Sequence, residues 1–391
     1  MSQKTQVAIV GAGPAGLLLG HLLRAEGIDC VVVERQSPEY VLGRIRAGVL
    51  EQITTDLLQR LGLDERLNKE GLLEEGFCLA DGERLIRINT YELTGKHVTI
   101  YGQTEVTRDL MDAAEDRGLE IIYEVSDVAL HDIESDAPYL TYDKDGKEHR
   151  IEARFIAGCD GYYGPSRQAI PVSVAREFER VYPFGWLGIL ADVPPCHDEL
   201  IYANHENGFA LASMRSKVRS RYYIDVAMTE KVEDWSDARL WDELAVRLGP
   251  DAAANITRGP ALEKSIAPLR SYVFEPMQHG SLFLAGDSAH IVPPTGAKGL
   301  NLAASDVHYL SEAFAGFFNR NDNDAVSGYA KKALSRVWKS ERFSWSLTKL
   351  MHRFPDDGPF ERKMQVAELG YIASSQAAQK SIAENYVGLP V

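Results

Sequence analysis

The sequence predicts an α/β fold, in which a Rossmann-like dinucleotide-binding domain carries an inserted, mainly antiparallel β-sheet domain and a helical C-terminal region. Three observations support this prediction. A glycine-rich turn lies between two short apolar runs at the start of the chain, and long β-type segments follow in the middle. Helical patterns follow residue 302, near residues 306–318, 325–351 and 360–378. We place the three parts at residues 1–174, 175–272 and 273–391.

The first unit has the pattern of a β-strand, a helix and a second β-strand. Residues 6–10 and 29–33 are the predicted strands, and Gly11, Gly13 and Gly16 form a GxGxxG turn before the helix. Gly11 allows a tight turn, Gly13 lets the backbone approach a pyrophosphate, and Gly16 permits close packing of helix and strand. The unit therefore predicts a dinucleotide site, and a purely structural glycine turn is the minority alternative.

Charged residues follow the second strand. Glu34 ends that strand at the position expected for a carboxylate that binds a ribose. Arg35, Arg44 and Arg46 come next, in an otherwise acidic chain. A solvated surface is the simpler interpretation of any single arginine, but three within twelve residues favour contact with an anion, because guanidinium groups match phosphates and carboxylates. No second GxGxxG flanked by strands occurs, so a second nucleotide needs a different kind of site.

A second strand and turn lie far along the chain. Residues 282–285 form a short apolar run that Gly286 ends, which places Asp287 at the carboxyl end of a strand, where open α/β sheets bind ligands. After the bend at residues 293–294, a glycine-rich helix start offers backbone N–H groups to an electron-rich ligand. Asp160 follows another predicted strand, over residues 151–159, and we expect both acidic turns to face one ligand. A helix cap at a tight turn is the alternative.

The middle segment, residues 175–272, contains strands with period-two alternation. This period places Ser213 and Arg215 on one face of a strand, and Tyr223 on one face of the next. With Tyr202 in an earlier strand, polar groups converge on one side of a sheet, where Arg215 can hold a small carboxylate bidentately. An ordinary solvated sheet face is an equally good interpretation from the periodicity alone.

Composition excludes several classes of protein. The formal net charge of −15 opposes nonspecific binding to nucleic acid or to an anionic membrane. The four cysteines form no CxxC and predict neither a disulfide framework nor a metal site. We find no transmembrane span, and we expect a reducing, cytoplasmic location.

The sequence patterns, in this order along the chain, resemble those of class A flavoprotein aromatic hydroxylases: GAGPAG, the terminal Glu34, the Asp160-Gly161 turn and LFLAGDSAH. A finer resemblance, to the branch of this family that hydroxylates 4-hydroxybenzoate, extends over the whole chain. It is carried by YVLGRIRAGVLEQ, IYGQTEVTRDLM, RVYPFGWLG, ELIYANH, KSIAPLRS, HIVPPTGAKGLNLAASDV and IAENYVGLP.

The resemblance implies an FAD-dependent monooxygenase that consumes NADPH as co-substrate. It converts 4-hydroxybenzoate to 3,4-dihydroxybenzoate with O₂, through a flavin C4a-hydroperoxide, and is a homodimer. The oxygen transferred is electrophilic, so the ring must be made electron-rich by deprotonating its phenol.

The resemblance also assigns roles to residues. FAD is implied to contact Gly11, Gly13, Gly16, Glu34, Gln103, Asp160, Asp287, Gly299, Leu300 and Asn301. The substrate carboxylate is implied to bind Ser213, Arg215 and Tyr223. Its phenol is implied to contact Tyr202, which continues to Tyr386, and the carbonyl of Pro294. NADPH binding or flavin placement is implied for Arg35, Arg44, Arg221 and Arg270.

The chain departs from the family at two positions. Glu74 stands where the family often has the histidine that ends a proton chain, and Tyr163 stands where a histidine commonly helps to bind NADPH. Two alternatives stay open. One is a hydroxylase of a related ring acid such as 3-hydroxybenzoate or 4-aminobenzoate, and the other is a non-catalytic flavin-fold carrier of the kind represented by the Rab GDP-dissociation inhibitors.

Overall fold

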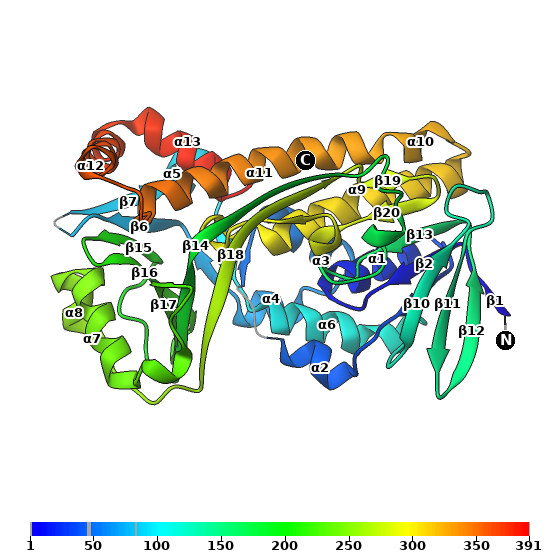
Figure 1. Cartoon of the computed structure of the whole chain (residues 1–391), viewed down its shortest axis with the longest axis horizontal. Helices are drawn as coiled ribbons and strands as arrows, with labels where there is room; N and C mark the ends of the chain where they lie inside the picture. Colours follow the sequence, from blue (N-terminus) through cyan, green and yellow to red (C-terminus); the bar gives the residue numbers. More distant parts are fainter. Residues whose placement is uncertain (1, 45–47, 83, 391) are drawn as a thin grey trace.

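The computed structural model describes residues 2–44, 48–82 and 84–390. It confirms the predicted mixed α/β architecture with several sheets and C-terminal helices. Figure 1 shows an elongated molecule in which the long strands β14 (Arg176–Ala191) and β18 (Glu263–Glu275) run through the middle. One end carries helices α7 (Asp237–Leu248) and α8 (Pro250–Asn255), and the other end carries a small four-stranded sheet.

A six-stranded sheet forms the dinucleotide-binding region. Its order is β19-β20-β13-β2-β3-β9, and all neighbours are parallel except β19. The strands are β2 (Val7–Val10), β3 (Cys30–Val33), β9 (Glu120–Ile122), β13 (Phe155–Gly158), β19 (Gln278–His279) and β20 (Leu282–Leu284). The strand expected over residues 151–159 is in fact two strands, because β12 (Lys147–Glu152) joins a separate sheet with β1 (Ser2–Lys4), β10 (Ser126–His131) and β11 (Tyr139–Lys144).

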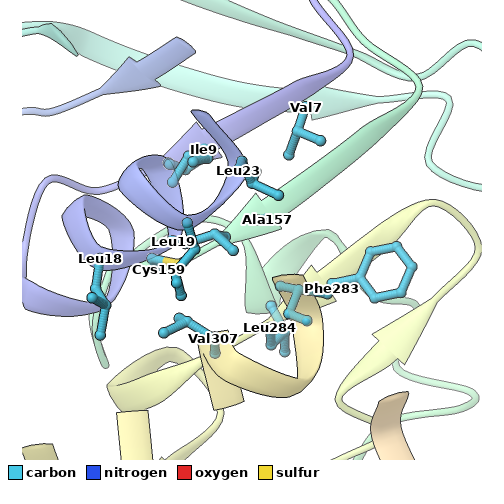
Figure 2. Close-up of a cluster of buried hydrophobic side chains, with 14 of the residues drawn as sticks. Val7, Ile9, Leu18, Leu19, Leu23, Ala157, Cys159, Phe283, Leu284 and Val307 are labelled. Carbon is cyan, nitrogen blue, oxygen red and sulfur yellow. The ribbon is translucent and has the colours of Figure 1, made fainter. Parts of the chain in front are cut away.

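The core of this region lies between the sheet and two helices, α1 (Pro14–Ala25) and α9 (Gly299–Arg320). Figure 2 shows Leu19 of α1 facing Val307 of α9 and Leu284 of β20, and Leu23 of α1 beside Ile9 and Val7 of β2. These apolar contacts fix both helices against the sheet, so the turns after β2, β13 and β20 gather at one edge.

An eight-stranded sheet crosses the middle of the molecule in the order β21-β18-β14-β17-β16-β15-β6-β7. Its other strands are β21 (His290–Ile291), β17 (Arg219–Ala227), β16 (Gly208–Ser216), β15 (Ile201–His205), β6 (Gly76–Ala80) and β7 (Leu85–Asn89). Most pairs are antiparallel, but β15 and β6 are parallel. The sheet thus extends beyond residues 175–272, because β6 and β7 come from the first third of the chain.

Both faces of this sheet are buried. Phe209 and Leu211 belong to one apolar cluster, and Tyr222 and Ile224 belong to another, which α7 covers with Leu240 and other apolar residues. The solvated-face interpretation is therefore wrong, because Ser213 and Arg221 are buried and Arg215 and Tyr223 are half-buried.

The helices differ in detail from the expected ones. A break at Gly328 separates α10 (Asp324–Ser327) from α11 (Tyr329–Met351), and Ser375 ends α12 (Pro359–Ser374) and caps α13 (Gln376–Tyr386) by accepting the amide of Ala378. The remaining helices are α2 (Pro38–Gly43), α3 (Gln52–Arg60), α4 (Glu65–Glu70), α5 (Thr90–Thr94) and α6 (Gln103–Asp116).

A three-stranded sheet has the order β4 (Val49–Leu50), β8 (Val98–Ile100) and β5 (Leu72–Glu74). In the described part of the chain, no helix has the length and apolar content that crossing a membrane requires.

Candidate active site

The glycine-rich turn after β2 has the geometry of a dinucleotide site. Gly11 has a φ of +103°, and a Cβ there would collide with the carbonyl oxygen of Cys159. Gly13 differs, because its Cβ position has no atom within 4 Å and faces open space. Helix α1 begins directly after Gly13 without a side-chain cap, so its first N–H groups are available to an anion.

Glu34 is fixed beside this turn. Its Oε2 accepts the Ala12 amide and its Oε1 accepts the Gln36 amide, both at 2.8 Å. Each carboxylate oxygen keeps further acceptor capacity, which suits a ribose hydroxyl. Arg35 and Arg44 are exposed beyond the strand, and Arg46 lies outside the described residues.

The two acidic turns differ in geometry. Asp287 is exposed. Its turn is held by the buried Asp306, whose Oδ2 accepts the Gly286 amide at 2.9 Å and lies 2.6 Å from Nε2 of His290. Asp160 instead folds back into its own loop, where its Oδ2 accepts the Ser166 amide at 2.8 Å. The exposed carboxylate of Asp287 has the geometry expected for contact with a ligand. A cofactor contact for Asp160 stays a prediction.

The start of α9 presents unpaired backbone amides. The first helical bond runs from the Leu302 amide to the Lys298 carbonyl, so the amides of Gly299 to Asn301 precede the ladder. Gly299 has open space at its Cβ position, and Pro294 in the preceding loop is exposed. This loop is held from α11, where Thr348 Oγ1 donates to Thr295 Oγ1 at 2.9 Å.

The side chain of Asn301 is committed to the protein itself. Its Oδ1 accepts the Glu51 amide at 2.8 Å and the Thr54 hydroxyl at 2.7 Å, while its Nδ2 donates to the carbonyls of Val49 and Ala297. Only the backbone amide of Asn301 remains for a cofactor. Gln103 opens α6 and is half-buried.

Ser213, Arg215 and Tyr223 lie on one face of the eight-stranded sheet. Arg215 Nη1 donates to Ser213 Oγ at 2.7 Å and to the Met214 carbonyl at 3.0 Å, and the Tyr223 hydroxyl interacts with the same guanidinium. Burial lowers the pKa of Arg215. Across the residues that the structure describes, Arg215 forms no ion pair, so this cation is suited to an anionic ligand.

Two arginines assigned by resemblance have partners within the protein. Arg221 lies 5.1 Å from the Tyr223 ring centroid and pairs with Glu263 at 3.3 Å. Arg270 lies 4.6 Å from the Tyr162 ring centroid and pairs with Glu179 at 3.2 Å. The neighbouring Tyr163 is 80% exposed. A nucleotide role for these residues stays a prediction.

The two tyrosines of the expected proton chain meet in the interior. Tyr202 on β15 and Tyr386 at the end of α13 have ring centroids 6.5 Å apart at 90°, and Phe77 stacks on Tyr386 at 4.0 Å. Burial raises the pKa of both hydroxyls, and the interaction with Tyr386 partly offsets this effect at Tyr202.

Sequence reasoning missed a buried charge cluster beside this pair. Lys298 Nζ donates to Glu51 Oε1 and to the Tyr386 carbonyl, both at 2.7 Å, and Arg336 donates to Glu51 Oε2 at 2.9 Å. Glu51, Lys298 and Arg336 are far apart in the sequence. The one local signal for this cluster was a lysine, Lys298, in the glycine-rich segment where a helix begins. Among the described residues, no group of three or more His, Cys, Asp or Glu side chains is arranged to hold a metal ion.

Comparisons with known proteins find similar sequences over most of the chain. The sequence profile of the FAD binding domain family matches residues 4–344. The chain is 55% identical over 390 residues to p-hydroxybenzoate hydroxylase of Acinetobacter baylyi, covering 100% of this chain and 96% of that protein. It is 27% identical over 360 residues to a rifampicin monooxygenase of Streptomyces venezuelae, covering 86% of this chain and 67% of that protein.

Solved structures show the same fold at low sequence identity. The crystal structure of p-nitrophenol 4-monooxygenase from Pseudomonas putida covers 100% of both chains with a TM-score of 0.84 and 17% identity. PqsL of P. aeruginosa, solved with 2-aminobenzoylacetate, covers 99% of this chain and 100% of its own with a TM-score of 0.73 and 19% identity.

Proposed function

The chain belongs to the FAD-dependent aromatic hydroxylases, and from this premise we propose that it hydroxylates 4-hydroxybenzoate to 3,4-dihydroxybenzoate with NADPH and O₂. One observation carries the choice of substrate. A half-buried guanidinium without a carboxylate partner, Arg215, lies on the same sheet face as the buried phenol of Tyr202. A flat ring acid with a carboxylate at one end and a phenol at the other matches these two groups.

The residues present fit FAD. The open space at Gly13 and the uncapped start of α1 suit the pyrophosphate, Glu34 suits the ribose, and the free amides at the start of α9 suit the pyrimidine edge of the flavin. Asp287, which is exposed, and Gln103, which opens α6, would contact the ribityl and pyrophosphate portion of FAD. Bound FAD, once reduced by NADPH, supplies an electrophilic oxygen derived from O₂.

The protein's own groups would hold the substrate and move its proton. Arg215, Ser213 and Tyr223 would bind the carboxylate, which compensates the buried positive charge. Tyr202 would accept the phenol proton while it passes its own proton to Tyr386, and so would make the ring electron-rich. The Pro294 carbonyl accepts the Ala297 amide at 2.9 Å, and its second lone pair would accept from a neutral phenol.

Assembly, location and reductant belong to the same proposal. Helix α11 presents Trp338 and Trp345 at 40% and 38% exposure, which suits a subunit contact and supports a homodimer. A cytoplasmic location is supported by four free, buried cysteines. Arg35, Gln36 and Tyr40, which follow the second strand, favour NADPH over NADH, and a direct comparison of the two reductants tests this preference.

The test is a substrate-stimulated NADPH assay on the yellow, FAD-containing protein. We expect 4-hydroxybenzoate to accelerate NADPH oxidation and to yield 3,4-dihydroxybenzoate, and Arg215→Ala to weaken substrate binding by about a hundredfold or more, as loss of a buried charge contact does. Equal NADPH oxidation with and without 4-hydroxybenzoate would refute the proposal. Product identification with 3-hydroxybenzoate and 4-aminobenzoate separates the related ring acids, and purified protein without FAD would favour the carrier alternative.

A further inference from the structure

The Tyr223 ring lies in a slot formed by two residues of the neighbouring strand β14. Gly188 pairs with Tyr223 across the sheet, and Trp186 is two residues earlier on the same face of β14. The ring centroids of Trp186 and Tyr223 are 5.2 Å apart. Because the Tyr223 hydroxyl interacts with the Arg215 guanidinium, this slot sets the position of a group proposed to hold the substrate carboxylate.

The slot has no room for a side chain at Gly188. A Cβ there would lie 2.7 Å from Cε1 and 2.8 Å from Cδ1 of Tyr223, and 2.8 Å from Nη2 of Arg221. All three distances are shorter than a van der Waals contact. The φ of Gly188 is not positive, so its backbone conformation does not require glycine, and a glycine weakens the interior of a strand. The space taken by the Tyr223 ring and the Arg221 guanidinium is therefore the reason for a glycine here.

Arg221 crosses β14 through the same gap. It starts on β17, and its Nη2 lies 3.3 Å from Glu263 Oε1 and 3.3 Å from Ser265 Oγ on β18. Ser265 pairs with Gly188 on the side of β14 that is away from Tyr223. The guanidinium therefore passes over Gly188, and its Cζ lies 5.1 Å from the centroid of the Tyr223 ring. A methyl group at position 188 would displace both side chains together.

A buried histidine holds Trp186, the other wall of the slot. Trp186 Nε1 donates to His352 Nε2 at 2.8 Å, and His352 Nδ1 lies 3.0 Å from the Thr348 carbonyl oxygen. A carbonyl oxygen only accepts, so Nδ1 carries the proton and Nε2 is the acceptor. His352 is 0% exposed, and burial lowers its pKa to about 3, so the imidazole is neutral at physiological pH. Its ring also stacks on Phe184 and Phe209, with centroids 4.7 and 4.1 Å apart, which fixes the orientation of the acceptor.

We propose that Gly188 and His352 are positioning residues that set the carboxylate end of the ring-acid site through the Tyr223 ring. Gly188 acts by leaving space for the ring, and His352 acts by fixing Trp186 beside it. This inference rests on the proposed function and deepens it, because it names residues that select a carboxylate at the Arg215 end. The residues proposed for FAD lie on other elements, so changes in the slot should alter carboxylate binding and leave FAD affinity unchanged.

The test measures the binding of three ring compounds to the oxidised holoenzyme through the change in flavin absorbance. The compounds are 4-hydroxybenzoate, benzoate, which has only the carboxylate, and phenol, which has only the hydroxyl group. We expect Gly188→Ala to raise the dissociation constants of 4-hydroxybenzoate and benzoate by about tenfold or more, since a hydrogen bond to a charged group contributes about that factor. The dissociation constant of phenol should change by less than about twofold, because phenol makes no use of the displaced Tyr223 hydroxyl.

Gly185→Ala is the matched control. It adds the same methyl group to the same strand on the opposite face, where the Cβ would lie 2.9 Å from Ile266 Cγ2 and 3.0 Å from both the Ala267 carbonyl oxygen and Met228 Sδ. Thermal unfolding of both variants measures the cost of the methyl group to stability. Gly185→Ala should bind all three compounds as the unaltered protein does, so a loss of stability is separated from a change in the site.

The second pair of variants tests His352. His352→Phe keeps a flat ring in the aromatic stack but leaves the Trp186 N–H without an acceptor, and we expect benzoate to bind about fivefold or more weakly while phenol binding is unchanged. His352→Gln should restore the benzoate dissociation constant to within about twofold, because its side-chain carbonyl can accept from Trp186. This pair also decides the proposal if Gly188→Ala does not fold.

Unchanged benzoate binding in Gly188→Ala or in His352→Phe overturns the positioning role of that residue and leaves the proposed function standing. An equal loss for benzoate and phenol shows a general structural role and overturns the proposal as well. If the unaltered holoenzyme binds neither 4-hydroxybenzoate nor benzoate, the proposed function fails, and the positioning roles fail with it.

Discussion

Replacing Glu74 by Gln should stabilise the protein at neutral pH, because it removes a carboxyl that is hard to ionise when folded. The pKa of Glu74 is raised from 4.5 to about 9 by burial. Below its pKa in the unfolded chain, the Glu74 carboxyl is protonated in both states and does not reduce the free energy of unfolding. Between that pKa and the higher pKa of the folded state, the carboxyl ionises only in the unfolded chain, so the free energy of unfolding falls as the pH rises. At about 1.4 kcal/mol per pH unit, the cost is about 1 kcal/mol at pH 5 and about 3 kcal/mol at pH 7.

Thermal unfolding of the holoenzyme measures this cost. At about 2.1 cal/mol/K per residue over 391 residues, the unfolding entropy is about 0.8 kcal/mol/K, so Glu74→Gln should raise Tm by about 4 °C at pH 7 and by about 1 °C at pH 5. Glu75→Gln, on the exposed side of the strand, should leave Tm unchanged at both pH values. A Tm difference that is the same at pH 5 and pH 7 would show that Glu74 is not held protonated by burial, and the reasoning would fail.

Three further predictions concern the phenol and the glycine-rich turn. Tyr202→Phe should keep NADPH oxidation stimulated by 4-hydroxybenzoate but lose about 90% or more of the product per NADPH, since binding survives while phenol activation fails; a normal product yield would contradict the role of Tyr202. Gly11→Ala should destabilise the apoprotein by about 3 kcal/mol, because its φ is positive and a Cβ would collide with the Cys159 carbonyl. Gly13→Ala, where the Cβ meets no protein atom, should leave the apoprotein Tm unchanged but weaken FAD binding by about tenfold or more, which apoprotein titration measures. Similar FAD affinity in Gly13→Ala and the unaltered protein would place the pyrophosphate elsewhere.

The parts of the fold that the sequence predicted correctly depend on local patterns. The GxGxxG turn between two apolar runs specifies its own geometry. Only glycine can take the positive φ and the close contact at position 11, and the open space at position 13 lets a ligand approach the backbone. Period-two alternation likewise placed Ser213 and Arg215 on one face of β16. Local patterns cannot show what covers a face, so periodicity alone could not separate a buried sheet from a solvated one.

The parts that the sequence could not predict depend on contacts between distant segments. The side chain of Asn301 is used up by residues some 250 positions earlier, and no local pattern signals this. The strand over residues 151–159 divides because its two halves pair with different sheets, which is a tertiary effect. The unpaired carboxyl of Glu74 is likewise visible only once β5, α13 and β16 are assembled.

The buried charge cluster links the cofactor end of the site to the phenol end. Lys298 immediately precedes the α9 amides proposed to face the flavin, and its Nζ holds both Glu51 and the carbonyl of Tyr386. Arg336 holds the other oxygen of Glu51 and donates to the carbonyl of Leu389, so the segment after Tyr386 is fixed as well. The start of α9 and the end of α13 are thus tied together through Lys298. In this arrangement, the backbone proposed to face the flavin is linked to the hydroxyl pair proposed to deprotonate the ring.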